Sequence, residues 1–230
     1  MRTIGIIGGM SWESSAEYYR IMNETVRARL GGTHSARCLM WSFDFHAIEA
    51  LQEAGDWAGA ADELVAAARR LEAGGAELLV IATNTMHRLV PRIEAAVDLP
   101  LLHIADPTAE AIAADELSTI GLLGTRYTME QEFYRGRLET RHGLNVLIPD
   151  EPDRTMVHDV IYDELVLGVV EAGSQARYVA AIERLVARGV EGVILGCTEI
   201  ELLVGADDVG VPIYPTTALH ARAAVEWALA

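Results

Sequence analysis

Lysine is absent from this chain of 230 residues, whose 18 basic residues are all arginine. An internal Schiff base with pyridoxal phosphate requires a lysine amine, and a Walker-type phosphate loop requires a lysine beside its glycines. Both are therefore excluded. Chemistry on an amino acid would have to proceed in this protein without a cofactor, and we predict that none is bound.

Cysteine and long apolar runs are also scarce. Cys38 and Cys197 are the only cysteines, too few for a disulfide framework, which fits a reducing compartment. The first residues run directly into a predicted strand, without the basic and apolar regions of a signal peptide. No apolar run reaches the roughly 18 residues that a membrane-spanning helix needs. We expect a cytoplasmic enzyme that does not use a membrane.

Positive charge is low relative to negative charge. The 34 acidic residues give the chain a net charge of -16, which argues against binding to the phosphate backbone of nucleic acids. Residues 5–10, Gly-Ile-Ile-Gly-Gly-Met, lack the spacing of a Rossmann fingerprint. The seven histidines show no close ligand spacing, so no metal is predicted. The expected partner is a small molecule.

An internal repeat is the main positive signal in the sequence. Residues 70–85 align with residues 184–199, 114 positions further on, and this alignment sets Thr83 opposite Cys197. Each stretch ends a predicted amphipathic helix, turns at a glycine and continues as a short apolar strand with a polar end. This is the layout of a βαβ unit, so the chain is predicted to hold two copies of one half.

Three further pairs of segments repeat at nearly the same spacing. They are residues 3–8 with 119–124, 18–20 with 133–135, and 99–101 with 211–213. The predicted fold class is α/β, with two pseudo-symmetric, doubly wound parallel-sheet halves facing one cleft, since open parallel sheets bind ligands at the carboxyl ends of their strands. The predicted halves are residues 1–115 and 116–230, with the active site between them and the last helix able to pack on the first half.

Hydrophobic periodicity predicts eight strands that alternate with helices. The strands are predicted at residues 3–7, 37–42, 78–82, 101–104, 119–123, 145–148, 192–195 and 212–214. Cap and first-turn preferences add several helix features. They are helix starts near Asp56, Pro107, Ser174 and Thr216, and a first turn that contains Pro91.

Four motifs follow predicted strands in order along the chain. They are Gly8-Gly9-Met10-Ser11-Trp12-Glu13-Ser14, Thr83-Asn84-Thr85-Met86-His87, Leu122-Leu123-Gly124-Thr125 and Gly196-Cys197-Thr198-Glu199. On these motifs the chain resembles the aspartate/glutamate racemase superfamily over essentially its whole length. Within that superfamily it is most similar to the broad-specificity amino-acid (aspartate/glutamate) racemase branch.

The resemblance implies an amino-acid racemase, an isomerase of the EC 5.1.1 type, that needs no pyridoxal phosphate and acts on aspartate or glutamate. Such an enzyme removes the Cα proton on one face and returns a proton on the other. The resemblance therefore implies Cys197 as the main acid/base group and Thr83 on the opposite face. A polar, donor-rich pocket is expected to lower the pKa of the thiol from about 8.5. Members of the family often pair, so a homodimer is expected.

The resemblance also implies a set of residues that bind the substrate. The predicted set is Met10, Ser11, Asn84, Thr85, His87, Thr125, Thr128, Thr198 and Glu199. Backbone and hydroxyl donors among them are expected to hold the substrate carboxylate. The same donors would stabilise the enolate-like charge that forms when the proton leaves.

The chain departs from the paired-cysteine pattern at Thr83, where the paired-thiol racemases have a cysteine. An alcohol is far less acidic than a thiol, so we expect the two directions of turnover to differ strongly. A one-face proton transferase, similar to arylmalonate decarboxylases with their lone cysteine, is the alternative enzyme. His46 and Leu167 stand where aspartate racemases carry arginine and lysine, which leaves Arg126 or a protonated His46 to bind a second carboxylate.

Other interpretations of single residues stay open at this stage. Thr83 could cap the following turn, and His87 could be a turn residue held by backbone groups. Glu199 could orient its neighbour, cap a helix or tune the Cys197 proton. Cys38 lies in an apolar run and is predicted to be buried without chemistry.

A non-catalytic amino-acid binding protein is the remaining alternative. Two halves around a cleft could bind an amino acid without transforming it, and such a protein has no need of a reactive thiol. Rapid alkylation of Cys197 that a ligand protects against would speak against this alternative.

Overall fold

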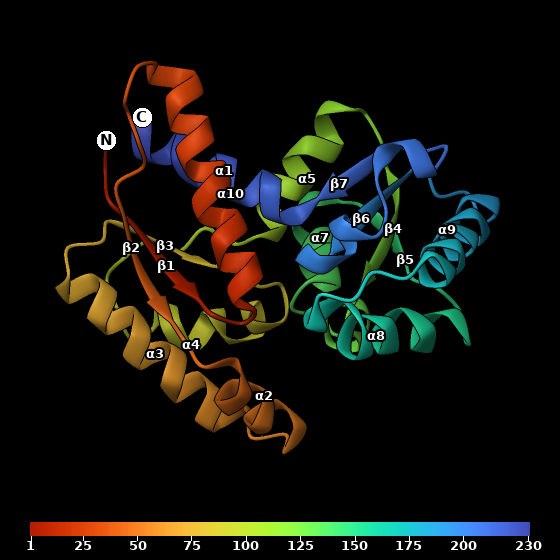
Figure 1. Cartoon of the computed structure of the whole chain (residues 1–230), viewed down its shortest axis with the longest axis horizontal. Coiled ribbons are helices and arrows are strands. Elements are labelled where there is room, and N and C mark those ends of the chain that lie inside the picture. The colour runs from red at the N-terminus through yellow and green to blue at the C-terminus, as the bar shows by residue number, and fades with distance from the viewer. The chain divides into compact units, whose positions relative to one another are not determined.

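The computed structural model describes all residues, Met1–Ala230, and the chain divides into two compact units. Unit 1 comprises Met1–Ile104 together with His220–Ala230, and unit 2 comprises Ala105–Leu219. Each unit holds one parallel sheet with helices packed on it (Figure 1). No helix is both long and apolar enough to cross a membrane.

Unit 1 contains a three-stranded parallel sheet in the order β2-β1-β3. The strands are β1 (Ile4–Gly8), β2 (Cys38–Ser42) and β3 (Leu78–Ile81). The helical elements are α1 (Trp12–Leu30), α2 (Phe45–Glu53), α3 (Trp57–Ala73), η1 (Thr85–Leu89), α4 (Val90–Glu94) and most of α10 (Thr216–Leu229). The central strand β1 is buried along its whole length, as expected of an apolar strand covered on both faces.

Unit 2 contains a four-stranded parallel sheet in the order β5-β4-β6-β7. The strands are β4 (Thr119–Gly124), β5 (Asn145–Leu147), β6 (Gly192–Gly196) and β7 (Ile213–Pro215). The helical elements are α5 (Ala105–Ala114), α6 (Arg126–Glu130), α7 (Arg135–His142), α8 (Asp153–Asp163), η2 (Leu165–Leu167), α9 (Ala172–Ala187), η3 (Thr198–Leu202) and η4 (Ala206–Asp208).

The two sheets repeat each other in hydrogen bonding as well as in strand order. Glu77 donates its backbone N–H to Thr3 O at 2.8 Å, and Glu191 donates to Thr119 O at the same distance. In both places the glutamate side chain also accepts a backbone N–H at the start of the neighbouring strand, at 2.7 Å from Thr3 and 2.8 Å from Thr119. The predicted α/β fold with two parallel sheets is confirmed.

One predicted strand is wrong. Residues 101–104 do not form a strand, because only Leu101 makes a bridge, to Leu79, before the chain turns into α5 at Ala105. The equivalent segment of unit 2 does pair with its neighbour and forms β7. Beyond Leu101, Leu102 O and the Ile104 N–H bond to histidine side chains, and the Leu102 N–H donates to Leu79 O of the sheet.

The predicted helix features agree with the structure at most positions. Asp56 is the N-cap of α3 and accepts the Gly59 N–H, Pro91 lies in the first turn of α4, and α10 begins at Thr216. Helix α5 begins two residues before Pro107. Helix α9 starts at Ala172, ahead of Ser174, whose hydroxyl donates to Glu164.

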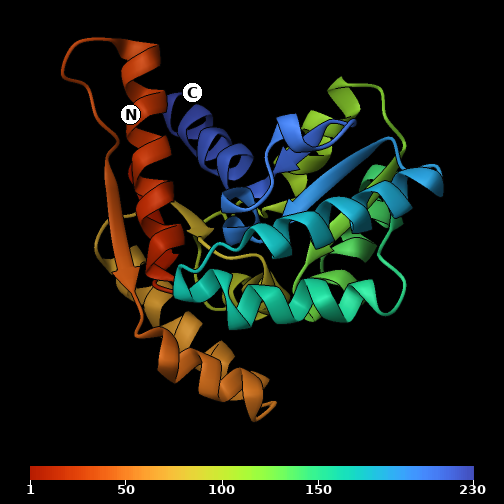
Figure 2. The same cartoon turned by 45° about the vertical axis from the view of Figure 1, so that its right-hand side comes forward.

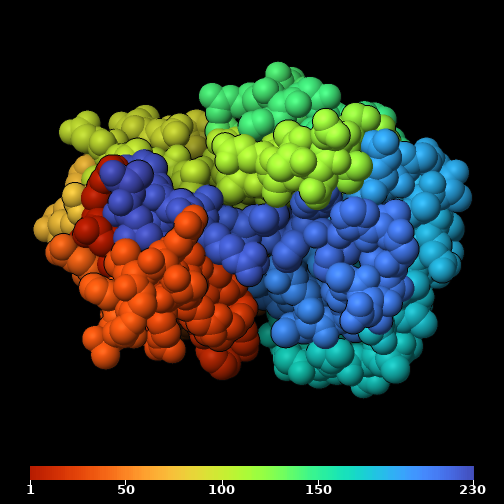
Figure 3. Space-filling view, turned by 90° about the horizontal axis from the view of Figure 1, so that it is seen from above, coloured from red at the N-terminus to blue at the C-terminus, as the bar shows by residue number.

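The boundary between the units lies between Ile104 and Ala105, and the chain returns to unit 1 at His220. Helix α5 belongs to unit 2, where Asp106 accepts two hydrogen bonds of 2.6 Å from Arg137. Most of α10 belongs to unit 1 and lies beside α1, with Arg29 paired to Glu226 at 2.7 Å (Figure 2). The last residues of α10 also lie against the N-terminal strand region (Figure 3), where Arg2 donates its N–H to Ala228 O.

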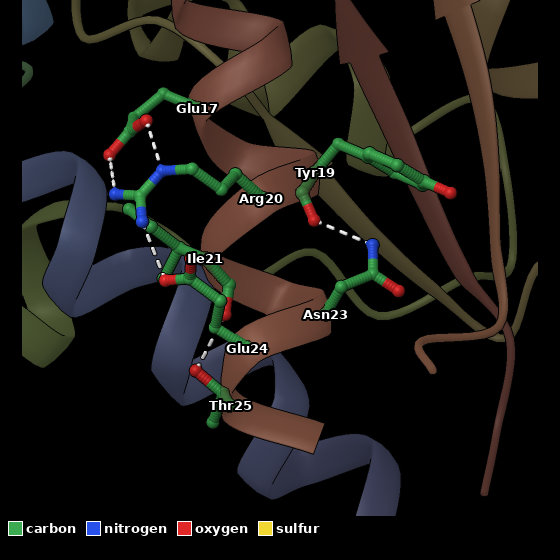
Figure 4. Close-up of polar contacts among 7 residues, drawn as sticks. All are labelled: Glu17, Tyr19, Arg20, Ile21, Asn23, Glu24 and Thr25. Carbon is green, nitrogen blue, oxygen red and sulfur yellow. Dashed lines mark hydrogen bonds and ion pairs between the residues drawn. The ribbon is translucent and has the colours of Figure 1, made fainter. Parts of the chain in front are cut away.

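The solvent side of α1 carries a row of polar contacts, drawn in Figure 4. Arg20 pairs with Glu17 and Glu24 on the same helix, and such exposed pairs stabilise a protein by about 0–1 kcal/mol. Asn23 has a different role, because its amide donates to Tyr19 O while its oxygen accepts the Ala36 N–H at 3.0 Å. Asn23 therefore ties the segment before β2 back to the helix.

Gly9 is required where the end of β2 crosses the loop after β1. Its φ is +83°, and an added Cβ would lie 2.3 Å from Phe43 N. We expect Gly9→Ala to lower the free energy of unfolding by about 3 kcal/mol or more, measured by urea denaturation. The control is Gly143→Ala, with φ +70° and open space around the new Cβ, which should cost only about 1 kcal/mol. Equal losses in the two variants would contradict the predicted clash.

Candidate active site

The polar end of β6 carries Cys197 beside the polar end of β4. Gly124 and Gly196 are paired across these strands, so Thr125 and Cys197 are the next residues on neighbouring strands. A Cβ added to Gly196 would lie 2.8 Å from Leu123 O, so glycine is needed for the strands to approach this closely. The register thus brings a thiol and a hydroxyl to the carboxyl edge of one sheet.

Cys197 is paired with a carboxylate. Its Sγ donates a hydrogen bond to Glu199 Oε2 at 2.9 Å, and Glu199 is buried. Burial of the thiol, and then the negative charge of Glu199, raise the pKa of Cys197 well above its ordinary value, although the Glu199 N–H acts in the opposite direction. The expectation that the pocket lowers this pKa is wrong, because the nearest polar group accepts a proton instead of donating one. Cys197 rests as a thiol.

Thr125 and Thr128 form a buried hydroxyl pair next to this thiol. Thr125 is the N-cap of α6 and accepts the Thr128 N–H, and the two hydroxyl oxygens are 3.3 Å apart. Thr128 packs against the glycine that precedes Cys197, since its Cγ2 lies 3.3 Å from a Cβ built on Gly196. Thr198 begins η3 and is half-buried. These hydroxyls therefore surround the start of the Cys197 loop.

Arg126 follows Thr125 and is exposed. Its backbone N–H donates to His158 Nδ1 at 3.2 Å, and burial together with the Arg126 charge lowers the pKa of His158. The exposed Arg126 side chain thus places a cation directly after the Thr125 cap, at the same strand end.

The polar ends of the unit 1 strands carry the other predicted residues. Met10 and Ser11 are both buried in the turn after β1. Ser11 is the N-cap of α1 and accepts the Ser14 N–H at 3.3 Å, while Ser15 Oγ accepts the Gly9 N–H at 2.7 Å. This network of serines fixes the shape of the loop at the carboxyl end of β1.

Thr83 lies just beyond β3 and is half-buried, whereas Asn84 and Thr85 are buried. Ala82 continues the sheet through a 2.9 Å bond from its N–H to Ile7 O. His87 is also buried, and its Nδ1 lies 2.8 Å from Thr83 O while its Nε2 accepts the Ile104 N–H at 3.2 Å. Both ring nitrogens of His87 therefore bond to backbone groups, in agreement with the turn interpretation of this residue.

Two positions expected to differ from aspartate racemases are open to solvent. His46 lies exposed in the first turn of α2, and Leu167 is 71% exposed at the end of η2.

Cys38, which was predicted to be buried, is half-buried because β2 is an edge strand, and partial burial raises the pKa of its thiol. No group of three or more His, Cys, Asp or Glu side chains lies close enough together to hold a metal ion.

Sequence reasoning missed a set of contacts around the Thr83 turn. Tyr18 donates its hydroxyl hydrogen bond to His220 Nδ1 at 2.6 Å, and His220 Nε2 lies 2.9 Å from Leu102 O. The two partners of the first bond are 202 residues apart, and no local pattern links them. The only signal was the repeat itself, which marked residues 18–20 as a landmark.

Comparison with known proteins extends over the whole chain. The sequence profile of the Asp/Glu/hydantoin racemase family matches residues 7–224. A crystal structure from Yersinia pestis, provisionally assigned as an Asp/Glu racemase, is 54% identical and superposes with a TM-score of 0.94 over 100% of both chains. An aspartate racemase homologue from Pyrococcus horikoshii OT3 is 33% identical, with a TM-score of 0.87 over 100% of both chains.

Curated sequences give a weaker match. Glutamate racemase from Persephonella marina is 25% identical over 143 residues, which are 61% of this chain and 52% of that enzyme. The chain thus spans about half the length of the glutamate racemases that it matches. The family profile, in contrast, extends over parts of both units and includes all four motifs. The resemblance predicted from the motifs is confirmed, and the chain belongs to the Asp/Glu/hydantoin racemase family.

Proposed function

We propose that this protein is a cofactor-independent amino-acid racemase that acts on aspartate or glutamate. Cys197 is its main acid/base group and Thr83 serves the opposite face of the substrate. The observation that carries the proposal is the hydrogen bond from Cys197 Sγ to the buried Glu199 carboxylate. The internal repeat aligns Cys197 with Thr83, which follows the matching strand of unit 1. Family membership supports the same reaction class.

The thiol and the carboxylate give Cys197 a route to act as a base. Cys197 passes its proton to Glu199 Oε2 along the 2.9 Å hydrogen bond, and the thiolate then takes the Cα proton of the substrate. The electron pair of the broken C–H bond stays on the substrate as an enolate-like carbanion. A thiolate whose pKa is raised is a strong base for this step, although it is rarely populated.

The second half of the reaction needs a proton on the other face. A proton returns to Cα from the Thr83 hydroxyl or from a water molecule bound to it, and solvent then restores the protons of both sides. Hydroxyl donors such as Thr125 and Thr198, with the backbone N–H groups of Asn84 and Thr85, hold the carboxylate and stabilise the carbanion. Met10, Ser11 and Thr128 shape the two strand ends, and Arg126 binds the side-chain carboxylate.

A one-face proton transferase is the second candidate. It is favoured by one observation: the sulfur and carboxylate pair is present only at Cys197, while the matching position of the repeat holds an alcohol. Such an enzyme would protonate a carbanion formed in another way, for example by loss of carbon dioxide. Isotope exchange separates the two candidates.

Proton NMR in D2O tests the proposal. The protein is incubated with the L- and D-forms of glutamate, aspartate and several neutral amino acids, and both Cα–H signal and optical configuration are followed. Washout of Cα–H with inversion is expected for at least one acidic amino acid. Washout without inversion would favour the one-face enzyme, and no exchange with any substrate would contradict the proposed reaction.

Thr83→Cys is expected to add a second thiol and to raise the rate from the slower enantiomer about tenfold or more, because a thiol donates and accepts protons near neutral pH far better than an alcohol. Initial rates from each pure enantiomer measure the effect. Thr83→Ser, which keeps an alcohol, is the matched control and should not show the gain. Unchanged rates in a folded Thr83→Cys variant would remove Thr83 from the proposed reaction.

We also propose, from family membership, that the chain forms a homodimer. Light scattering coupled to size-exclusion chromatography gives the mass in solution. A mass of twice 25.0 kDa is expected, and a mass of 25.0 kDa at all concentrations would contradict pairing.

A further inference from the structure

Two histidines of unit 1 bond to the backbone of residues 102–104, which follow the last bridge of the sheet and precede unit 2. His220 Nε2 lies 2.9 Å from Leu102 O, and His87 Nε2 lies 3.2 Å from the Ile104 N. The rings of His87 and His220 contact each other edge to face, at 5.7 Å between centroids, and His103 contacts His87 at 4.7 Å. Histidine side chains therefore continue the backbone pairing that ends at the Leu79–Leu101 bridge.

The partners of His87 define where its proton lies. Nδ1 faces the carbonyl oxygen of Thr83 at 2.8 Å, so Nδ1 carries the hydrogen and donates it. Nε2 faces the N–H of Ile104, so Nε2 has no hydrogen and accepts. His87 is therefore held as one neutral tautomer, in which Nδ1 donates a hydrogen bond and Nε2 accepts one.

The bond to Thr83 O fixes the plane of the peptide that joins Thr83 to Asn84. In a trans peptide the N–H points opposite to the C=O, so a carbonyl turned toward His87 turns the Asn84 N–H the other way. The same peptide sets the direction in which the Thr83 side chain leaves the backbone. His87 thus controls both polar groups through which this strand end would meet a substrate.

We propose that His87 is a positioning residue for the Thr83 face of the site, acting through its Nδ1–H bond to Thr83 O. It does not touch the reacting atoms. It also fixes the Thr83 turn to Ile104, the last residue of unit 1 before the chain enters unit 2. The catalytic consequence rests on the racemase function proposed above, whereas the tautomer and the two bonds do not.

Three variants separate the two nitrogens of His87. An asparagine amide lies near the position of Nδ1, and a glutamine amide lies near that of Nε2. His87→Asn keeps the donor to Thr83 O, His87→Gln keeps the acceptor for Ile104, and His87→Ala loses both. The measured quantity is the ratio of inversion to Cα–H washout in D2O, since inversion needs the Thr83 face and washout needs only Cys197.

We expect the ratio to fall about tenfold or more in His87→Gln and His87→Ala and to stay within about threefold of the wild type in His87→Asn. His220→Gln is the matched control, because His220 is as buried as His87 but has no bond to Thr83; it should lose stability and keep the ratio. An equal ratio in all variants, with lower stability alone, would reduce His87 to a structural residue and overturn the proposal.

A second measurement needs no activity. Nitrogen-15 NMR of the histidine rings, with the His87 signals assigned by their loss in His87→Gln, should show His87 protonated on Nδ1 and not on Nε2 near neutral pH. Protonation on Nε2 would overturn the proposal even if the variants were active. If the wild type exchanges no Cα–H with any substrate, the racemase function fails, and the tautomer result still decides whether His87 holds the Thr83 carbonyl.

Discussion

Replacement of Cys197 by alanine is expected to lower Cα–H washout from both enantiomers of the substrate by about 10³-fold. The reason is that Cys197 combines a transferable proton with a carboxylate acceptor, whereas Thr125 and Thr128 are alcohols that bond to each other. Proton NMR in D2O measures the loss. Because Cys197 is only half-buried, the variant with the smaller alanine side chain should fold normally.

The matched control for this variant is Cys38→Ala. Cys38 is the other cysteine, it is half-buried like Cys197, and it lies at the start of the edge strand β2. Its replacement should leave both washout and inversion unchanged. If Cys197→Ala kept more than about a tenth of the wild-type washout, the acid/base role of Cys197 would be refuted.

Glu199→Gln is expected to have opposite effects on two measurements at the same thiol. The negative charge of Glu199 raises the pKa of Cys197, so its removal lowers that pKa and increases the thiolate fraction. Alkylation of Cys197 by iodoacetamide at pH 8 should become about tenfold faster, because the thiolate is the form that reacts. Cα–H washout should become about 10²-fold slower, because the acceptor of the thiol proton is lost.

The control is Glu201→Gln. Glu201 lies in the same short helix, and its charge is the weakest of the influences that raise the pKa of Cys197. Its replacement should change both rates by less than about threefold. Slower alkylation in Glu199→Gln, or faster washout, would show that Glu199 does not receive the Cys197 proton.

The raised pKa also changes how alkylation of the wild type should be interpreted. A half-buried thiol bonded to a carboxylate reacts slowly at neutral pH, and the rate of its alkylation should increase with pH as more of the thiol is deprotonated. Slow alkylation at pH 7 therefore does not favour a non-catalytic binding protein. The rate of Cα–H exchange in the wild type, compared with the rate in Cys197→Ala, distinguishes the racemase from the binding protein.

The repeat explains why much of the fold could be predicted from the sequence. The alignment of Thr83 with Cys197 rests on apolar strands that end in polar residues, and both strands form at the expected places. Periodicity failed at residues 101–104, because an apolar run can pair with a sheet or be held by side chains from elsewhere. The histidine partners there come from residues 87 and 220, which no local pattern associates with this segment.

The chemistry of the site was less predictable than its position. The motif Gly-Cys-Thr-Glu placed Cys197 and Glu199 two residues apart, and this spacing is compatible with a cap, an orienting contact or a direct hydrogen bond. Only the backbone of the turn between β6 and η3 decides among them, and it brings the sulfur within 2.9 Å of Oε2. The direction of the pKa shift follows from burial of the thiol and then from that contact, and neither could be obtained from residue types alone.

The return of His220–Ala230 to unit 1 has a consequence for the order in which the two units can be completed during synthesis. Unit 2 is one continuous segment, Ala105–Leu219, and can fold as soon as that segment has left the ribosome. Unit 1 lacks His220–Ala230 until the whole of unit 2 has been synthesised. Until then the apolar side of α1 and the hydroxyl of Tyr18 have no α10 to cover them, so the half of the protein that is made first is the half that is finished last.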